Sequence, residues 1–160
     1  MDSIKHNNSR RDFIRKTTLG ATGLILLPSF LKASKGLVTA ANEKVNLACI
    51  GIGNRGAEII GEFAKTGLAN IVALCDTDMG APQTTKVMNL FPAAEKFQDF
   101  RKMFEKMGNA IDAVCIGVPD HSHFPITMHA MMLGKHVYVE KPLARTFQEN
   151  ELLMKAARKY

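Results

Sequence analysis

From residue 45 onward, short apolar runs alternate along the chain with segments whose apolar positions recur every three or four residues. Continuous apolar runs of strand length indicate buried strands, and the longer period indicates amphipathic helices. The pattern predicts strands at residues 45–50, 70–75, 96–100, 112–118 and 135–140. It predicts helices at residues 57–65, 82–91, 101–107, 122–133 and from 146 onward.

Helix boundaries support this assignment. Gly67 and Gly108 follow the first and third helices as stop signals, and Pro125 is accepted in the first turn of the helix at 122–133. Thr146 and Glu149 have capping-box spacing. Strands alternating with helices are typical of βαβ units, so we predict an α/β fold with a Rossmann-type doubly wound parallel sheet.

Residues 1–40 have the layout of an export signal rather than of a folded element. "SRRDFIRK" contains the pair Arg10–Arg11, a moderately apolar stretch follows, and small residues at 38–40 offer a cleavage site. The apolar stretch is too short and interrupted for a good membrane span. We expect a twin-arginine signal, the twin-arginine translocase as partner and a periplasmic location, with an uncleaved, membrane-anchored form as the alternative.

The charge distribution and the cysteine positions bear on two function classes, nucleic-acid binding and metal binding. The formal net charge is +6, but residues 1–40 hold seven Lys/Arg against two Asp, which accounts for +5. The remainder is close to neutral and carries no basic stripe, so a nucleic-acid partner is not expected. The three cysteines stand in separate apolar runs without metal-ligand spacing. They are interpreted as buried thiols, and no metal site is predicted.

The sequence "GIGNRG" follows the first predicted strand and opens the first predicted helix. In that context G-x-G-x-x-G indicates a dinucleotide-binding loop. Gly51 permits the tight turn, Gly53 lets the backbone approach the pyrophosphate, and Gly56 lets helix and strand pack closely. Asn54 and Arg55 complete the loop, at a helix N-terminus whose free N–H groups suit phosphates.

Asp76 ends the second predicted strand, 20 residues after Gly56. An acidic residue there receives the ribose hydroxyls and repels a 2′-phosphate, which favours NAD. Arg55 could offset that preference, so NADP stays open. Asp76 as a solvated turn or helix cap is the alternative interpretation. A methyltransferase also has a glycine-rich loop, but its usual acidic residue on the first strand is missing.

Three motifs together resemble the Gfo/Idh/MocA family, named after glucose-fructose oxidoreductase and inositol dehydrogenase. They are "GIGNRG", "VPDHSH" after the fourth strand and "EKPL" after the fifth, within residues 45–160. The resemblance implies that Pro119, Asp120 and His123 line the ribose and nicotinamide side. Val118 stands where the family commonly has threonine. Helix capping by Asp120 or Ser122, with solvated histidines, is the alternative.

The resemblance also implies that Lys141 is the catalytic acid/base, placed between nicotinamide and substrate. Glu140 and Lys141 cannot both face the substrate, because adjacent strand residues point to opposite sides. We therefore expect Glu140 to fix the backbone or contact the cofactor, and Pro142 to hold Lys141 extended. A solvated lysine at a strand exit is the alternative.

These expectations combine into three hypotheses. The first is an NAD(P)-dependent oxidoreductase that acts on a sugar, polyol or related carbinol. The second is a glycoside hydrolase that uses transient NAD-mediated oxidation and elimination, as in some relatives of this family. The third is a dinucleotide-binding fragment without activity, because the family's second, substrate-binding domain is not encoded before Tyr160. We expect the full-length protein to be a homo-oligomer.

Overall fold

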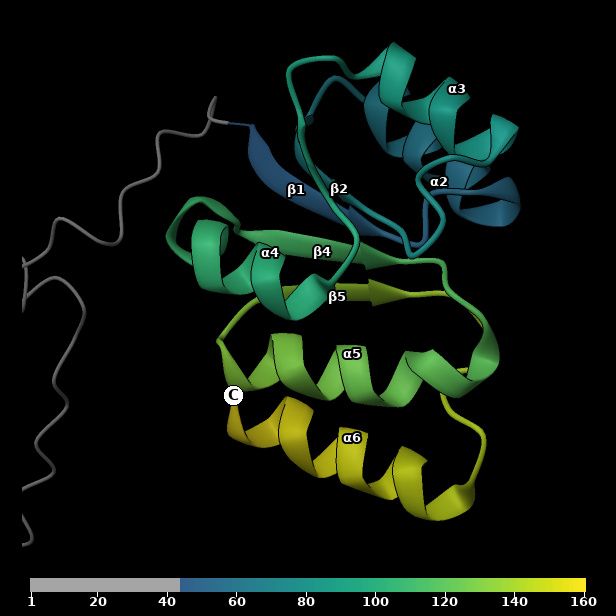
Figure 1. Cartoon of the computed structure of the whole chain (residues 1–160). Helices are drawn as coiled ribbons and strands as arrows, with labels where there is room; N and C mark the ends of the chain where they lie inside the picture. Colours follow the sequence, from purple (N-terminus) through teal and green to yellow (C-terminus); the bar gives the residue numbers. More distant parts are fainter. Residues whose placement is uncertain (1–43) are drawn as a thin grey trace, which may run out of the picture. The chain divides into compact units, whose positions relative to one another are not determined.

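The computed structural model describes residues 44–160, which form one parallel sheet in the strand order β3-β2-β1-β4-β5 with helices on both faces (Figure 1). The predicted α/β, Rossmann-type fold is confirmed. The predicted export signal at 1–40 lies outside the described residues. Within residues 44–160, none of the helices has the length and apolar character required to span a membrane.

The elements follow the predicted alternation closely. The strands are β1 (Val45–Ile50), β2 (Ala69–Cys75), β3 (Glu95–Phe97), β4 (Ala113–Ile116) and β5 (His136–Val139). The helices are α2 (Asn54–Lys65), α3 (Pro82–Leu90), α4 (Phe100–Met107), the short 3₁₀ helix η1 (Gly108–Ala110), α5 (Asp120–Met132) and α6 (Phe147–Lys159).

Several boundaries differ from the prediction by one to three residues, and two of them have a clear local reason. The third strand ends at Phe97 rather than residue 100, because the Asp99 carboxylate accepts a hydrogen bond from the N–H of Arg101 and starts α4. Helix α5 starts at Asp120, directly after Pro119, so Pro125 lies inside the helix and not in its first turn. No side chain caps α5, so Asp120 is a first-turn residue and not the cap.

Each face of the sheet has its own hydrophobic core. Side chains alternate between the faces along each strand, so α2 and α3 cover one face and α4 and α5 the other (Figure 1). One core contains Leu47, Cys49, Ile59, Ile60, Leu74, Val87 and Cys115. The other contains Ala48, Ile50, Met103, Phe104, Val114, Ile116, Ile126 and Ala130. Helix α6 packs on α5.

Strand β2 carries one irregularity. Leu47 of β1 pairs with Ile71, but the next residue, Ala48, pairs with Ala73, so Val72 is an extra residue in β2. Val72 and Ala73 accordingly pack on the same core, whereas the neighbouring Ile71 packs on the other. The alternation is then regular to the end of the strand.

The three thiols are buried, as predicted. Burial, followed by the charges of Asp76 and Asp99, raises the pKa of Cys75 to about 12. Burial, then the charge of Glu140, raises the pKa of Cys115 to about 12. The pKa of Cys49 is raised well above 9.0, first by burial and then by Cys115. Thiols this weakly ionised are packing groups and not nucleophiles.

Candidate dinucleotide-binding site

A cleft of about 660 Å³ lies where the strands end at their carboxyl side. This is the edge where open α/β sheets bind ligands, and the volume is that of an ordinary small-molecule site. Of the sequence-predicted residues, the cleft is lined by Gly51, Gly53, Asn54, Arg55, Asp76 and Pro119.

The glycine loop packs so tightly that two of its glycines leave no room for a side chain. Gly51 has φ +78°, and a Cβ on it would lie 2.6 Å from the backbone of Gly117. A Cβ on Gly56 would lie 1.9 Å from the carbonyl oxygen of Gly51. Gly53 differs, since the nearest atom to its Cβ would be Cγ of Gln83 at 3.2 Å. Side chains of α3, and not backbone, therefore border Gly53, which itself lines the cleft.

The first turn of α2 is free to bind an anion. Gly53 is its N-cap and provides no side-chain cap, and the turn contains no acidic residue. Asn54 enters the helix with φ +42°, a left-handed conformation that asparagine tolerates better than most residues. Uncapped N–H groups and the helix dipole together favour a phosphate at this position.

Asp76 supports the glycine loop from the neighbouring strand. Its Oδ2 accepts a hydrogen bond from the N–H of Ile52 at 2.9 Å, and its Oδ1 accepts one from the N–H of Asp78 at 3.0 Å. A carboxylate has about four acceptor positions, so Asp76 can still accept hydroxyl donors from the cleft. The residue predicted to hold the ribose thus also fixes the loop that would hold the pyrophosphate.

The predicted residues after β4 lie in different environments. Pro119 lines the cleft, together with His121 and Ser122, which sequence analysis did not assign to the cofactor. Asp120 is exposed, and neither it nor His123 lines the cleft. His123 is buried, and its Nδ1 donates to the carbonyl oxygen of Pro142. His123 therefore links α5 to the turn that follows β5.

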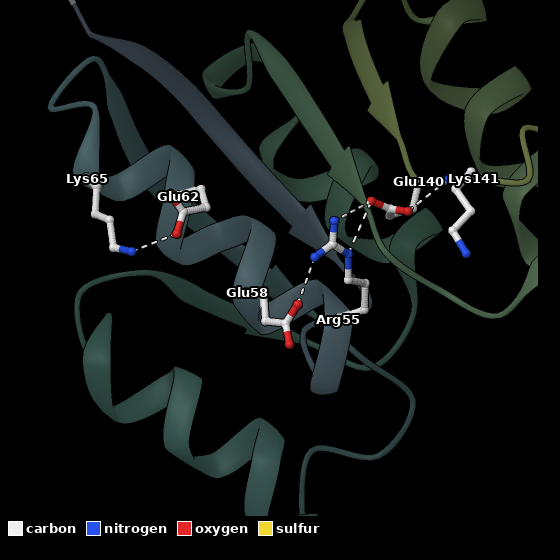
Figure 2. A network of polar contacts seen from close by, with 6 residues as sticks. All are labelled: Arg55, Glu58, Glu62, Lys65, Glu140 and Lys141. Carbon is white, nitrogen blue, oxygen red and sulfur yellow. Dashed lines mark hydrogen bonds and ion pairs between the residues drawn. The ribbon is translucent and has the colours of Figure 1, made fainter.

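Glu140 connects that turn to the glycine loop, as Figure 2 shows. Its Oε1 accepts hydrogen bonds from Arg55, at 3.1 Å from Nη2 and 3.3 Å from Nε. Its Oε2 accepts from the backbone N–H of Lys141 at 3.1 Å. Arg55 also donates from Nη1 to Glu58 at 2.8 Å. The Lys141 side chain is exposed, and its Nζ makes no hydrogen bond or ion pair within residues 44–160 (Figure 2).

The hydrogen bonds shift the pKa values of this group. The pKa of Glu140 is lowered, first by the hydrogen bond from Arg55 and then by the one from the N–H of Lys141. The pKa of Arg55 is raised by its hydrogen bonds to Glu58 and Glu140. Both side chains are therefore charged at neutral pH.

Several cleft residues were missed by sequence reasoning. Gly117 is the most informative, since a Cβ on it would lie 2.8 Å from Cα of Gly56. The available signal is the position of Gly117 near the carboxyl end of a strand, but the predicted strand at 112–118 includes it. Gln98, Phe100 and Arg101 line the other end, where the Arg101 guanidinium lies 4.4 Å from the Phe100 ring centre. Residues 44–160 contain no cluster of three or more potential metal ligands.

Comparison with known proteins agrees with this geometry. Residues 45–160 match the family model for the Gfo/Idh/MocA oxidoreductase family, NAD-binding Rossmann fold. Among curated relatives, glycosyl hydrolase family 109 protein 2 from Shewanella sp. ANA-3 is 31% identical over 88% of this chain. An alpha-N-acetylgalactosaminidase from Shewanella oneidensis is 29% identical over 90% of it. The chain spans about a third of these relatives' length, 35% and 36% respectively.

Solved structures give the same result. A dehydrogenase from Chromobacterium violaceum matches with a TM-score of 0.66 at 28% identity, covering 73% of this chain and 33% of that one. The WlbA dehydrogenase from Bordetella pertussis, in complex with NADH and UDP-GlcNAcA, matches with a TM-score of 0.63 at 26% identity, covering 73% and 35%. Together with the cleft, these matches show that the chain belongs to the Gfo/Idh/MocA oxidoreductase family and forms a Rossmann domain for a nicotinamide dinucleotide.

Proposed function

We propose that this chain is the dinucleotide-binding part of an enzyme that transfers hydride between a nicotinamide and the carbinol carbon of a sugar or polyol. The observation that carries the proposal is the link between the glycine loop and the Lys141 turn, through Arg55 and Glu140, at one edge of the sheet. A phosphate-binding loop and an amine that has no partner within residues 44–160 are thereby held at the same edge of the sheet, although Glu140 and Lys141 do not themselves line the cleft.

The residues of the cleft fit a dinucleotide. Gly53, which lines the cleft, and the uncapped first turn of α2 suit the pyrophosphate, and Asp76 suits the adenosine ribose. When bound, the dinucleotide supplies the hydride acceptor or donor at its nicotinamide carbon. Lys141 Nζ would take the hydroxyl proton as hydride leaves the carbinol carbon, or return it in the reverse direction. Pro119 would line the nicotinamide side, and a contact between Asp120 and the cofactor stays a prediction.

We further propose NAD rather than NADP. The Asp76 carboxylate would repel a 2′-phosphate at the ribose position. Arg55, the residue that could offset this repulsion, has its guanidinium bonded to Glu58 and Glu140.

A second candidate function is an NAD-dependent glycoside hydrolase. It is favoured by curated relatives named as glycosyl hydrolase family 109 proteins and as an alpha-N-acetylgalactosaminidase. Both functions begin with the same step, removal of hydride from a sugar carbinol carbon with loss of the hydroxyl proton. In the hydrolase, oxidation is followed by elimination of the aglycone and addition of water to the resulting double bond, and the hydride is then returned, so no net NADH forms.

Binding and activity measurements on the full-length protein test these proposals. Mass spectrometry and nicotinamide fluorescence should detect bound or bindable dinucleotide, and failure to bind any would overturn both functions. Sugars and polyols would then be assayed for NADH formation, and aryl glycosides for cleavage with and without added NAD. Lys141→Ala should lower turnover at least tenfold in whichever assay is positive. Unchanged turnover would remove Lys141 from the mechanism.

We also propose export through the twin-arginine pathway, which carries folded proteins, so that the cofactor is loaded in the cytoplasm and held tightly in the periplasm. The support is the sequence of residues 1–40, with the pair Arg10–Arg11. Replacing both arginines by lysine should leave the protein in the cytoplasmic fraction. An unchanged periplasmic fraction would contradict export by this route. The homo-oligomer is tested by light scattering of the full-length protein.

A further inference from the structure

Arg55 and Glu140 form an ion pair between two segments that lie 85 residues apart in the chain. The two partners differ in exposure, because 63% of the Arg55 side chain is accessible but only 12% of the Glu140 side chain. Burial of the carboxylate reduces screening of the pair by water and salt. Glu140 also uses its second oxygen to hold the N–H of Lys141. One carboxylate therefore restrains both the first turn of α2 and the residue proposed to move the proton.

The strand order shows which end of the cleft Arg55 serves. Asp76 follows β2 and Glu140 follows β5, and strands β1 and β4 lie between those two strands. With neighbouring strands about 4.8 Å apart, the ends of β2 and β5 are separated by about 14 Å. A guanidinium bonded to Glu140 is therefore directed away from the ribose position beside Asp76.

We infer that Glu140 is a positioning residue: through Arg55 it ties the phosphate-binding loop to the Lys141 turn, and Arg55 acts as this tie and not as a 2′-phosphate ligand. The inference rests on the proposed function of Lys141. It also predicts coupling between the cleft and the Lys141 turn, because displacement of the α2 first turn changes the support of Lys141.

The first test compares Glu140→Gln, Arg55→Gln and the double variant in the full-length protein. Each single change removes the charge pair, and we expect kcat to fall about 3- to 10-fold with KM for the carbinol substrate changing less than about twofold. The double variant should be no slower than the slower single variant, because both changes break the same link. Multiplied losses in the double variant would overturn the inference.

Glu58→Gln is the matched control. Glu58 is the other carboxylate bonded to Arg55. Its side chain is 67% exposed and makes no hydrogen bond to the Lys141 turn. We expect its kcat to stay within about twofold of wild type. Thermal melts of all variants separate positioning from damage to the fold. If loss of folded protein accounts for the whole fall in kcat of Glu140→Gln, the inference is overturned.

The second test measures the affinities of NAD and NADP for Arg55→Gln. If Arg55 is the tie, both affinities change by the same factor and the NAD/NADP ratio stays constant. A selective loss of NADP affinity would assign Arg55 to the 2′-phosphate and overturn the inference.

Lys141→Ala distinguishes failure of the inference from failure of the proposed function. If Lys141→Ala is inactive while Glu140→Gln turns over like wild type, the proposed function stands and the positioning role is wrong. If Lys141→Ala retains full turnover, the proposed function of Lys141 is wrong, and the positioning role fails with it.

Discussion

At the scale of single residues, the site depends on glycines that meet backbone to backbone. Gly51, Gly56 and Gly117 come from the loop after β1, from α2 and from the loop after β4, and each occupies space that a Cβ on another would need. The motif "GIGNRG" revealed the first two. Gly117 could not be recognised in the same way, because its partners are distant in sequence and only the strand order brings them together.

The first prediction compares two glycines of the same helix. Gly56→Ala should destabilise the fold by about 3 kcal/mol, because the new Cβ would lie 1.9 Å from a backbone oxygen that cannot move freely. Gly61→Ala has no atom within 4 Å of its Cβ and should stabilise α2 by about 0.5–1 kcal/mol. Chemical denaturation followed by circular dichroism measures both. Equal effects would contradict the packing described.

The second prediction concerns the pH dependence of Glu140. Its pKa in the fold lies below the ordinary value of 4.5, so its bonds stabilise the fold above that value. This contribution is lost as the pH falls through the folded-state pKa. Wild type should therefore melt at a higher temperature than Glu140→Gln at pH 7, and the difference should disappear in strong acid. A difference that is the same at every pH would contradict the charged pair.

At the scale of elements, local sequence signals predicted nearly every helix and strand. The capping box of α6 is confirmed, since the Thr146 side chain accepts from the N–H of Glu149 and the Glu149 side chain accepts from that of Thr146. The prediction of α5 is less accurate, because Pro125 indicates a first turn whereas the helix has already begun at Asp120. A helix start is a balance of local contacts, and one residue type does not determine it.

The third prediction tests that capping box. Thr146→Ala should cost about 1 kcal/mol, because the N–H of Glu149 loses its acceptor. Thr146→Ser keeps the hydroxyl and should cost much less. Amide hydrogen exchange in the first turn of α6 measures the effect, and faster exchange in the alanine variant alone is expected. Equal exchange in both variants would show that the cap is not used.

At the scale of the whole molecule, the strand order assembles the cleft. The sequence predicted that Asp76, the loop after β4 and the turn after β5 would meet at one edge of the sheet, and the strand ends do lie there. It could not predict that Arg55 would bond to Glu140, or that four of the predicted contact residues would not line the cleft: Asp120, His123, Glu140 and Lys141. Those outcomes depend on side-chain contacts between distant elements, which a motif does not encode.

The fourth prediction links dinucleotide binding to stability of the whole fold. NAD at 100 times its dissociation constant should stabilise the protein by about 2.7 kcal/mol, because it binds only the folded state. Gly53→Ala should change the unliganded stability by less than about 1 kcal/mol, since its Cβ would meet side-chain atoms of Gln83 and Thr84 and no backbone. It should nevertheless lose most of the stabilisation by NAD. Thermal melts with and without NAD measure both, and full stabilisation of the variant would contradict a ligand over Gly53.

The extra residue in β2 determines where the chain can change in length. Deleting Val72 would make the pairing with β1 regular and leave Ala73, Leu74 and Asp76 on their present sides of the sheet. Deleting Leu74 would turn the side chain of Cys75, the last residue of β2, toward the opposite core. We therefore expect one-residue gaps among relatives to fall at Val72, because that is where a deletion keeps the Asp76 carboxylate in phase with the glycine loop.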